Sequence, residues 1–158
     1  GFLPHNFNPA KLFMGDAGSM FIGYFLSTMG ILTGKMTVNS MQNNLYYILP
    51  VLILSYAIFD ISLVGYTRKR DGRRISQGGK DHSTHRIDTA MGSTKITAIV
   101  VYLINTIIVL TAIIVLKLHS VEVLIFSTIL YVLAFLFFGR KLDSIPIVIP
   151  KNQLKNQG

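Results

Sequence analysis

One short segment places an acidic residue between glycines, directly before an apolar run. Residues 13–19 read FMGDAGS, and no other acidic residue occurs before Asp60. Gly15 and Gly18 would let a bulky anion approach the backbone, toward which the first amides of a following helix point. A carboxylate repels phosphate oxygens unless a cation lies between them, and Mg²⁺ commonly binds carboxylates, water and substrate phosphates together. Asp16 is therefore a candidate metal ligand, and an N-cap of the following helix is the alternative.

A second segment combines basic residues with histidines. Between Tyr66 and Asp88 the chain has seven Lys or Arg and three Asp, and the segment closes on DHSTHR. If DHSTHR is helical, the imidazoles of His82 and His85 share a face beside Arg86, and such donors can hold a phosphate or a nucleotide. Two histidines without a nearby Glu or Cys make a poor zinc site. The alternatives are a topology signal resting on anionic headgroups, and histidines exposed to solvent.

Other polar residues lie within apolar stretches. Asp60, in AIFDIS, would lie about 7 Å from the loop by helix rise; it is either a functional residue or one that simply reaches water. Asn105 is expected to hydrogen-bond between helices, and Pro50 to kink its helix. His5 and His119 show no pattern and are expected at the surface.

The composition indicates which elements must position these residues. Hydrophobic residues make up 51% of the chain and charged residues only 14%, whereas soluble domains have about 25% charged residues. Runs near the ~20 residues that cross a bilayer can only be helices in lipid. The sequence therefore predicts an all-α, polytopic helical membrane protein with about four transmembrane helices, at residues 17–33, 45–65, 95–116 and 121–138. Cysteine is absent, which excludes disulfides and thiolate metal sites.

The charges predict the topology of these helices. Lys and Arg accumulate on the cytoplasmic side of membrane proteins. They are concentrated in the loop 66–94 and the tail 139–158, whereas the connector 34–44 has only Lys35. The loop and tail are therefore expected in the cytoplasm, and counting crossings places FMGDAGS there too. Nucleic-acid binding is disfavoured, because the loop between Tyr66 and Asp88 has no aromatic residue for base stacking.

Taken together, these motifs are similar to those of a known family. The run HNFNPAKLFMGDAGSMFIGY, the IFD that follows and the closing DHSTHRI resemble the polyprenyl-phosphate N-acetylhexosamine-1-phosphate transferases, from Phe2 to about Ile87. The resemblance implies a reaction at the cytoplasmic face of a bacterial-type plasma membrane. A polyprenyl phosphate such as undecaprenyl phosphate attacks the β-phosphate of a UDP-N-acetylhexosamine, such as UDP-N-acetylglucosamine, and UMP is released. The product would initiate a cell-envelope polysaccharide.

The same resemblance implies roles for individual residues. Asp16 would be the catalytic metal ligand for Mg²⁺, with Mn²⁺ as an alternative. The nucleotide diphosphate would be held by His82, His85 and Arg86. The other residues expected to bind substrate are Gly15, Gly18, Ser19 and Arg73.

Departures from the family pattern lead to a further expectation. Thr84 stands where the family often has a middle histidine, and Ile61 follows Asp60 where the family often has threonine. The family's paired aspartates lie upstream of the segment seen here, so we expect residues 1–158 to be the C-terminal part of a longer enzyme and inactive alone. A homodimer is left open. The rival interpretation is a noncatalytic membrane protein that binds anionic lipid or a partner through its basic loop; a transporter fits less well, because the spans hold few polar residues.

Overall fold

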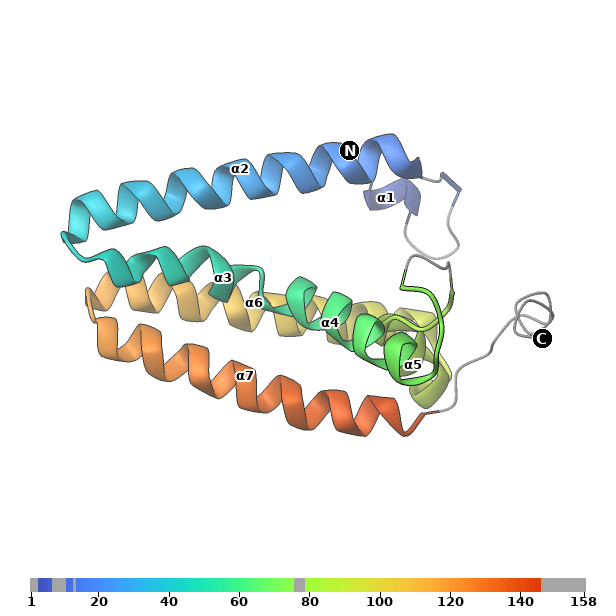
Figure 1. The fold of residues 1–158 in the computed structure, drawn as a ribbon. Helices are drawn as coiled ribbons and strands as arrows, with labels where there is room; N and C mark the ends of the chain where they lie inside the picture. The colour runs from blue at the N-terminus through green and yellow to red at the C-terminus, as the bar shows by residue number, and fades with distance from the viewer. Residues whose placement is uncertain (1–2, 7–10, 13, 76–78, 146–158) are drawn as a thin grey trace.

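The computed structural model describes residues 3–6, 11–12, 14–75 and 79–145, and this part of the chain is helical and contains no strand. The predicted all-α fold is confirmed. The elements in chain order are α1 (Leu3–Asn6), α2 (Gly15–Met41), η1 (Asn44–Ile48), α3 (Leu49–Ile53), α4 (Ser55–Arg70), α5 (Ser83–Met91), α6 (Thr94–Leu118) and α7 (Val121–Asp143) (Figure 1).

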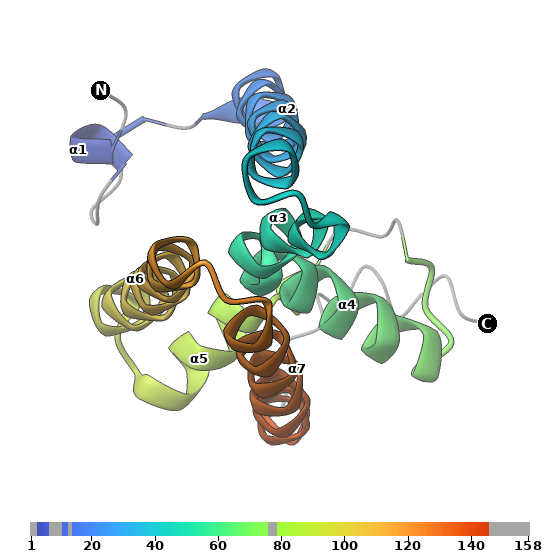
Figure 2. The same cartoon turned by 90° about the vertical axis from the view of Figure 1, so that its left-hand side faces the viewer.

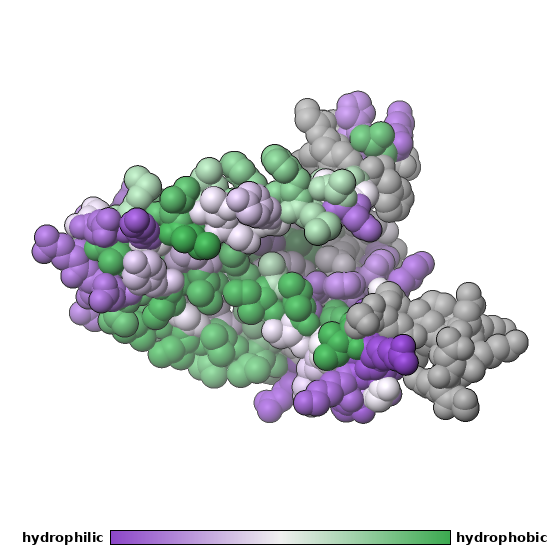
Figure 3. Space-filling view, turned by 45° about the horizontal axis from the view of Figure 1, so that its top comes forward, coloured by the Kyte–Doolittle hydropathy of each residue, from purple (hydrophilic) through white to green (hydrophobic). Residues whose placement is uncertain are grey.

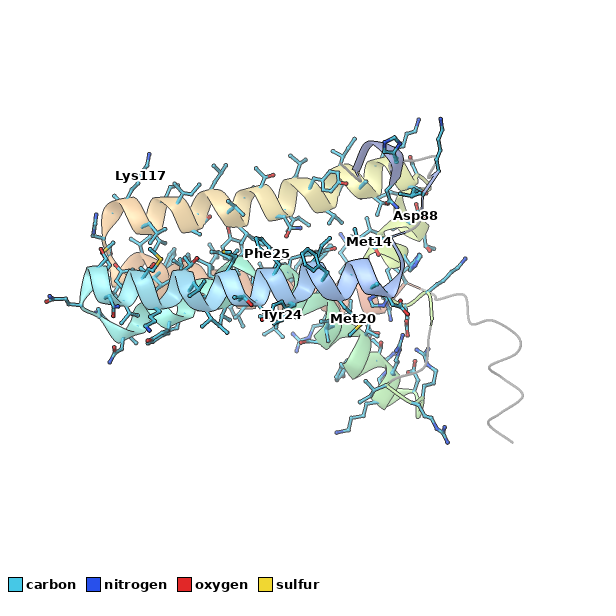
Figure 4. The ribbon with its side chains drawn as sticks, turned by 90° about the horizontal axis from the view of Figure 1, so that it is seen from above. Met14, Met20, Tyr24, Phe25, Asp88 and Lys117 are labelled. Atoms are coloured by element: carbon cyan, nitrogen blue, oxygen red, sulfur yellow. The ribbon has the colours of Figure 1, made fainter. Side chains whose placement is uncertain are left out.

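The long helices run back and forth between two ends of the molecule. One end, here called the loop end, carries the start of α2, residues 71–75 and 79–82, α5 and the end of α7 (Figure 1). The far end carries the turns from α2 to η1 and from α6 to α7. Figure 4 shows Met14 and Asp88 at the loop end and Lys117 at the far end. FMGDAGS, the basic loop and α5 therefore share one end, as the crossing count predicted.

In the part of the chain that the structure describes, three helices are long and apolar enough to cross a membrane: α2, α6 and α7. The bent pair formed by Asn44–Ile53 and Ser55–Arg70 is a fourth candidate span. Many large apolar side chains on these helices are exposed, and in Figure 3 they form a hydrophobic band between hydrophilic ends. An apolar exterior of this kind suits a lipid solvent rather than water.

The second predicted span is a broken helix. Its two parts meet at 67°. Pro50 lies in the first turn of α3, where its missing N–H costs nothing. The backbone instead leaves helical geometry at Leu54, which has φ −89° and ψ 6°. The expected bend is present, but its position at Pro50 was wrong.

The first helix extends beyond the predicted 17–33 and reaches Met41. Its last turns pack on the following segment, because a Cβ at Gly34 would lie 3.2 Å from Cγ of Pro50. Figure 2 shows α2 at one edge of the molecule, above α3. The core of the far end is formed by Val38, Tyr46, Leu49, Leu52, Ala112, Val115 and Leu124.

A smaller core at the loop end holds α5 in place. Leu63 of α4, Ile87 of α5 and Leu142 of α7 are buried against one another. Helix α5 stops at Gly92, whose φ of 66° is the left-handed conformation that commonly ends helices. The loop end is thus a packed unit rather than a loose connector.

Two predictions about isolated polar residues had different outcomes. His119 is exposed, as expected, and its Nδ1 lies 2.8 Å from Sδ of Met41. Asn105 was expected to bond between helices, but its amide donates to the carbonyl of Val101 within α6, at 2.9 Å. That expectation was wrong, because the carbonyl one turn back is within reach of the Asn105 amide.

Candidate active site at the loop end

The structure places Asp16 in the first turn of α2, exposed to the surroundings. The N-cap position is Met14, so the alternative role of Asp16 as an N-cap is not observed. Gly15, the first residue of α2, has a φ of 66°, a left-handed conformation that glycine adopts readily. Among the described residues no donor hydrogen-bonds to the Asp16 carboxylate; the Ser19 hydroxyl donates to its backbone carbonyl, at 2.9 Å. The carboxylate is thus available to a cation.

Gly18 has a packing role close to Asp16. A Cβ at Gly18 would come within 2.6 Å of Cγ of Met14. The absence of a side chain therefore lets Met14 lie against the first turn of α2. The packing of Met14 on Gly18 does not test whether an anion approaches the backbone here. That expectation from the sequence stays a prediction.

The two histidines of the loop lie at the start of α5. His82 is the N-cap residue, with φ −62° and ψ 154°, and its side chain is half exposed. His85 lies in the first turn of α5 and is exposed. The sequence placed both imidazoles on one face if DHSTHR is helical. The structure starts the helix after His82, so the histidines share a helix end.

A carboxylate from α4 reaches this helix start. Oδ1 of Asp60 accepts the backbone N–H of Ser83 at 2.6 Å, and Oδ2 lies 2.8 Å from Nδ1 of His82. The hydroxyls of Tyr56 and Ser83 are hydrogen-bonded at 2.9 Å. Asp60 therefore does more than reach water, since it supplies the cap that the His82 side chain does not provide.

The loop before His82 is organised around Asp81, which is 1% exposed. Arg68 donates two hydrogen bonds to the Asp81 carboxylate, from Nε to Oδ2 at 2.7 Å and from Nη2 to Oδ1 at 2.6 Å. Arg73 donates to Oδ2 at 3.2 Å. Hydrogen bonding to Arg68, together with the charges of Arg68 and Arg73, holds the pKa of Asp81 below its usual value. The carboxylate is therefore a fixed anion inside the loop.

Arg86 ties the loop to the last helix. Its guanidinium is buried, with Nε donating to the carbonyl of Asp81 at 3.1 Å and Nη1 to the carbonyl of Leu142 at 3.0 Å. Asp143 lies 3.7 Å from Nη1 of Arg86 and also pairs with Arg70. Arg73 and Arg86 are thus engaged by protein groups in this structure, and direct contact with a ligand stays a prediction for both.

An apolar groove of about 580 Å³ runs between α4 and α7, within the range of small-molecule pockets. Its aromatic wall includes Phe59 and Phe135, whose rings stack with centroids 4.8 Å apart. Ser55 lies toward the bend, and Arg140 lines the loop end of the groove. Arg140 is exposed, so the groove could hold an apolar chain with an anionic head near this cation.

Sequence reasoning missed three residues of this assembly: Tyr56, Asp81 and Asp143. One signal was available, because Tyr56 and Asp60 are four residues apart and therefore face the same side of a helix. The pairings of Asp81 and Asp143 depend on how the loop and α7 fold, which spacing alone does not reveal.

The donor set for a metal is small in the described ranges 3–6, 11–12, 14–75 and 79–145. They contain no cluster of three or more His, Cys, Asp or Glu that could hold a metal ion. Asp16 is one exposed carboxylate. A single carboxylate can bind Mg²⁺ only where water and substrate phosphates supply the remaining ligands.

Comparison with known proteins places these features in a family context. Residues 1–34 match the model of glycosyl transferase family 4. The chain is 36% identical over 114 residues to the probable undecaprenyl-phosphate N-acetylglucosaminyl 1-phosphate transferase of Bacillus subtilis, covering 72% of this chain and 31% of that protein. It is 32% identical over 114 residues to the decaprenyl-phosphate N-acetylglucosaminephosphotransferase of Mycobacterium tuberculosis, covering 65% of this chain and 27% of that protein.

A third relative has a related printed activity. The chain is 36% identical over 121 residues to the phospho-N-acetylmuramoyl-pentapeptide-transferase of Synechocystis, covering 71% of this chain and 30% of that protein. No solved structure was found to match. The chain thus spans about a third of the length of these curated relatives. The resemblance noted in the sequence is confirmed: residues 1–34 match glycosyl transferase family 4, and the chain is similar over about two thirds of its length to proteins named as polyprenyl-phosphate N-acetylglucosamine-1-phosphate transferases.

Proposed function

We propose that these residues form part of an enzyme that transfers N-acetylhexosamine 1-phosphate from a UDP-sugar to a polyprenyl phosphate, releasing UMP. The observation that carries the proposal is the juxtaposition at the loop end. The start of α2 with Asp16 lies at the same end of the molecule as the histidines of α5 (Figure 1). Relatives with 32% and 36% identity carry names describing transfer of this kind.

Asp16 would be the metal ligand in this proposal. Its carboxylate is exposed and has no hydrogen-bond donor among the described residues, as a ligand awaiting a cation should be. Bound Mg²⁺, or Mn²⁺ in its place, would neutralise the diphosphate charge. Water and substrate phosphates would complete the coordination. Because these residues span about a third of the relatives' length, we propose the activity for a chain of that length.

His82 and His85 would contact the diphosphate of the nucleotide. Both lie at the amino end of α5, where imidazole N–H groups can donate hydrogen bonds to an anion. Arg86 and Arg73 would support this surface by holding Asp81 and the loop. The histidines would thus bind and orient the sugar nucleotide for attack by the lipid phosphate.

The polyprenyl chain would lie in the groove between α4 and α7. The groove is mostly apolar and is lined by Arg140 and Asp143 at the loop end. An isoprenoid chain would contact the apolar lining there, and Arg140 would attract the phosphate. This arrangement requires the loop end to face the cytoplasm, where the sugar nucleotide is available; the basic loop supports that orientation.

Replacement of the proposed metal ligand tests the function. In the enzyme that contains these residues, Asp16→Asn should lower UMP release at least about a thousandfold, because an amide binds Mg²⁺ weakly and neutralises no charge. Ser27→Ala is the matched control, since Ser27 lies on the same helix and donates only to the carbonyl of Gly23.

Initial rates of UMP release from UDP-N-acetylglucosamine in membranes would be compared at saturating Mg²⁺. Turnover of Asp16→Asn within tenfold of the wild type would reject the metal role. Equal loss in Ser27→Ala would instead indicate damage to α2.

A further inference from the structure

Asp60 makes two contacts that together determine how His82 is presented. One carboxylate oxygen accepts the Ser83 N–H at 2.6 Å, and the other lies 2.8 Å from Nδ1 of His82. The side chain of Asp60 is 20% exposed and that of His82 is 44% exposed. The Asp60 carboxylate therefore lies on the buried side of the imidazole ring, and the opposite side of the ring is exposed.

These contacts determine which imidazole nitrogen faces outward. An ionised carboxylate can only accept hydrogen bonds, so Nδ1 must carry the proton in this contact. In the imidazole ring Nε2 points away from a partner at Nδ1. None of the described residues hydrogen-bonds to Nε2, so this nitrogen is free for a ligand.

We propose that Asp60 is a positioning residue that orients His82 for phosphate binding. It fixes Nδ1–H against α4 and directs Nε2 toward the diphosphate of the sugar nucleotide. Its charge balances the imidazolium form, in which both nitrogens donate. The inference rests on the proposed function, because it assumes that His82 contacts the nucleotide.

The same carboxylate also fixes the helix that carries the second histidine. The Ser83 N–H is one of the first amides of α5, and no side chain of the N-cap residue satisfies it. Asp60 thus holds His82 and the start of α5 with one group. The Tyr56 hydroxyl adds a separate bond to the Ser83 hydroxyl at 2.9 Å, so α4 holds the start of α5 at two points.

The Asp60→Asn variant tests the charge of the Asp60 carboxylate separately from its hydrogen bond to the Ser83 N–H. The asparagine oxygen can still accept the Ser83 N–H, but its amide nitrogen then faces His82 and donates to Nδ1. The neutral ring is forced to carry its proton on Nε2. The substitution therefore preserves the cap of α5 while inverting the tautomer of His82.

The test uses the full-length protein in nanodiscs, with UDP-N-acetylglucosamine binding measured by calorimetry. His82→Ala should weaken binding about tenfold, the loss expected for one charge-assisted hydrogen bond. Asp60→Asn should weaken binding by less, because Nε2–H of the neutral ring can still donate to a phosphate but without the imidazolium charge. The double variant should bind no more weakly than His82→Ala, because both changes act through the same side chain. Thr89→Ala, which changes α5 without touching Asp60 or His82, should bind normally.

Nitrogen NMR of the histidines adds a readout that does not depend on the nucleotide. The His82 signals, assigned by their loss in His82→Ala, should show Nδ1–H in the wild type and Nε2–H in Asp60→Asn. Another tautomer in the wild type, or additive losses in the double variant, would overturn the positioning role. If His82→Ala binds the nucleotide normally but the tautomers behave as expected, the proposed nucleotide contact fails while the Asp60–His82 coupling stands.

Discussion

At the residue scale, buried charge is concentrated on Asp81. Its carboxylate is 1% exposed and accepts three hydrogen bonds from Arg68 and Arg73. A buried ion pair contributes little net stability compared with apolar residues, but removing one partner leaves the other charge unpaired. The loop that presents His82 therefore depends on this anion.

Asp81→Asn should lower the free energy of unfolding by about 3–5 kcal/mol, because Arg68 would remain buried without a counter-charge. Asp71→Asn is the matched control. Asp71 is a third exposed and pairs with Arg70 and Arg73 at 3.2 Å and 3.4 Å, so its loss should cost less than about 1 kcal/mol. Unfolding in detergent micelles would be followed by circular dichroism.

The same comparison has a defined pH dependence. The folded state lowers the pKa of Asp81, so its stabilising contribution is fully present above the unfolded pKa of about 3.9. It is lost as the pH falls below that value toward the lower folded pKa. The difference in free energy of unfolding between wild type and Asp81→Asn should therefore shrink in acid. A constant difference down to about pH 2 would contradict the assignment of a lowered pKa to Asp81.

At the element scale, apolar length predicted most of the helices. The runs at 95–116 and 121–138 correspond to α6 and α7, which are a few residues longer. The position of the bend at Leu54 was not predictable, because the nearest proline, Pro50, lies four residues earlier. The extension of α2 to Met41 depends on packing against Pro50, a tertiary contact that periodicity does not contain.

The candidate site was predictable to a similar extent. The motifs identified Asp16, His82 and His85, because acids between glycines and paired histidines are uncommon in apolar chains. The partners that hold them were not identified. Arg68 and Asp81 are 13 residues apart in sequence, and their contact requires the loop to fold back onto α4.

Close approach of α2 and α3 gives a prediction about helix packing. Gly34→Leu should destabilise the protein by about 1–3 kcal/mol, because a Cβ would already lie 3.2 Å from Cγ of Pro50. Gly23→Leu, in the same helix, is the control, since nothing lies within 4 Å of a Cβ there. Thermal unfolding in nanodiscs would compare them, and equal shifts would show that α2 does not pack on α3 in the membrane.

At the scale of the whole molecule, the arrangement assigns each end to one side of a membrane. The chain has no cysteine, so single cysteines can report on topology without background. Lys80→Cys, just before α5 at the loop end, should react with a membrane-impermeant maleimide only from the cytoplasmic side. Lys117→Cys, at the far end (Figure 4), should react only from the opposite side.

Ile129→Cys, in the apolar part of α7, is the control and should react from neither side of intact vesicles, because thiolate formation requires water. Labelling would be measured in right-side-out and inverted membrane vesicles. Reaction of Lys80→Cys and Lys117→Cys from the same side would contradict the crossing pattern of the helices.

The bond from Arg86 to the Leu142 carbonyl also has a consequence for biosynthesis. Arg86 precedes its acceptor by 56 residues, so the ribosome must make two further membrane helices before the guanidinium has its full set of partners. Domains begin to fold while synthesis continues, but the histidine segment cannot reach its final arrangement until α7 has been inserted. Maturation of the candidate site would therefore be among the last events in assembly of this region, after its first helices are already in the bilayer.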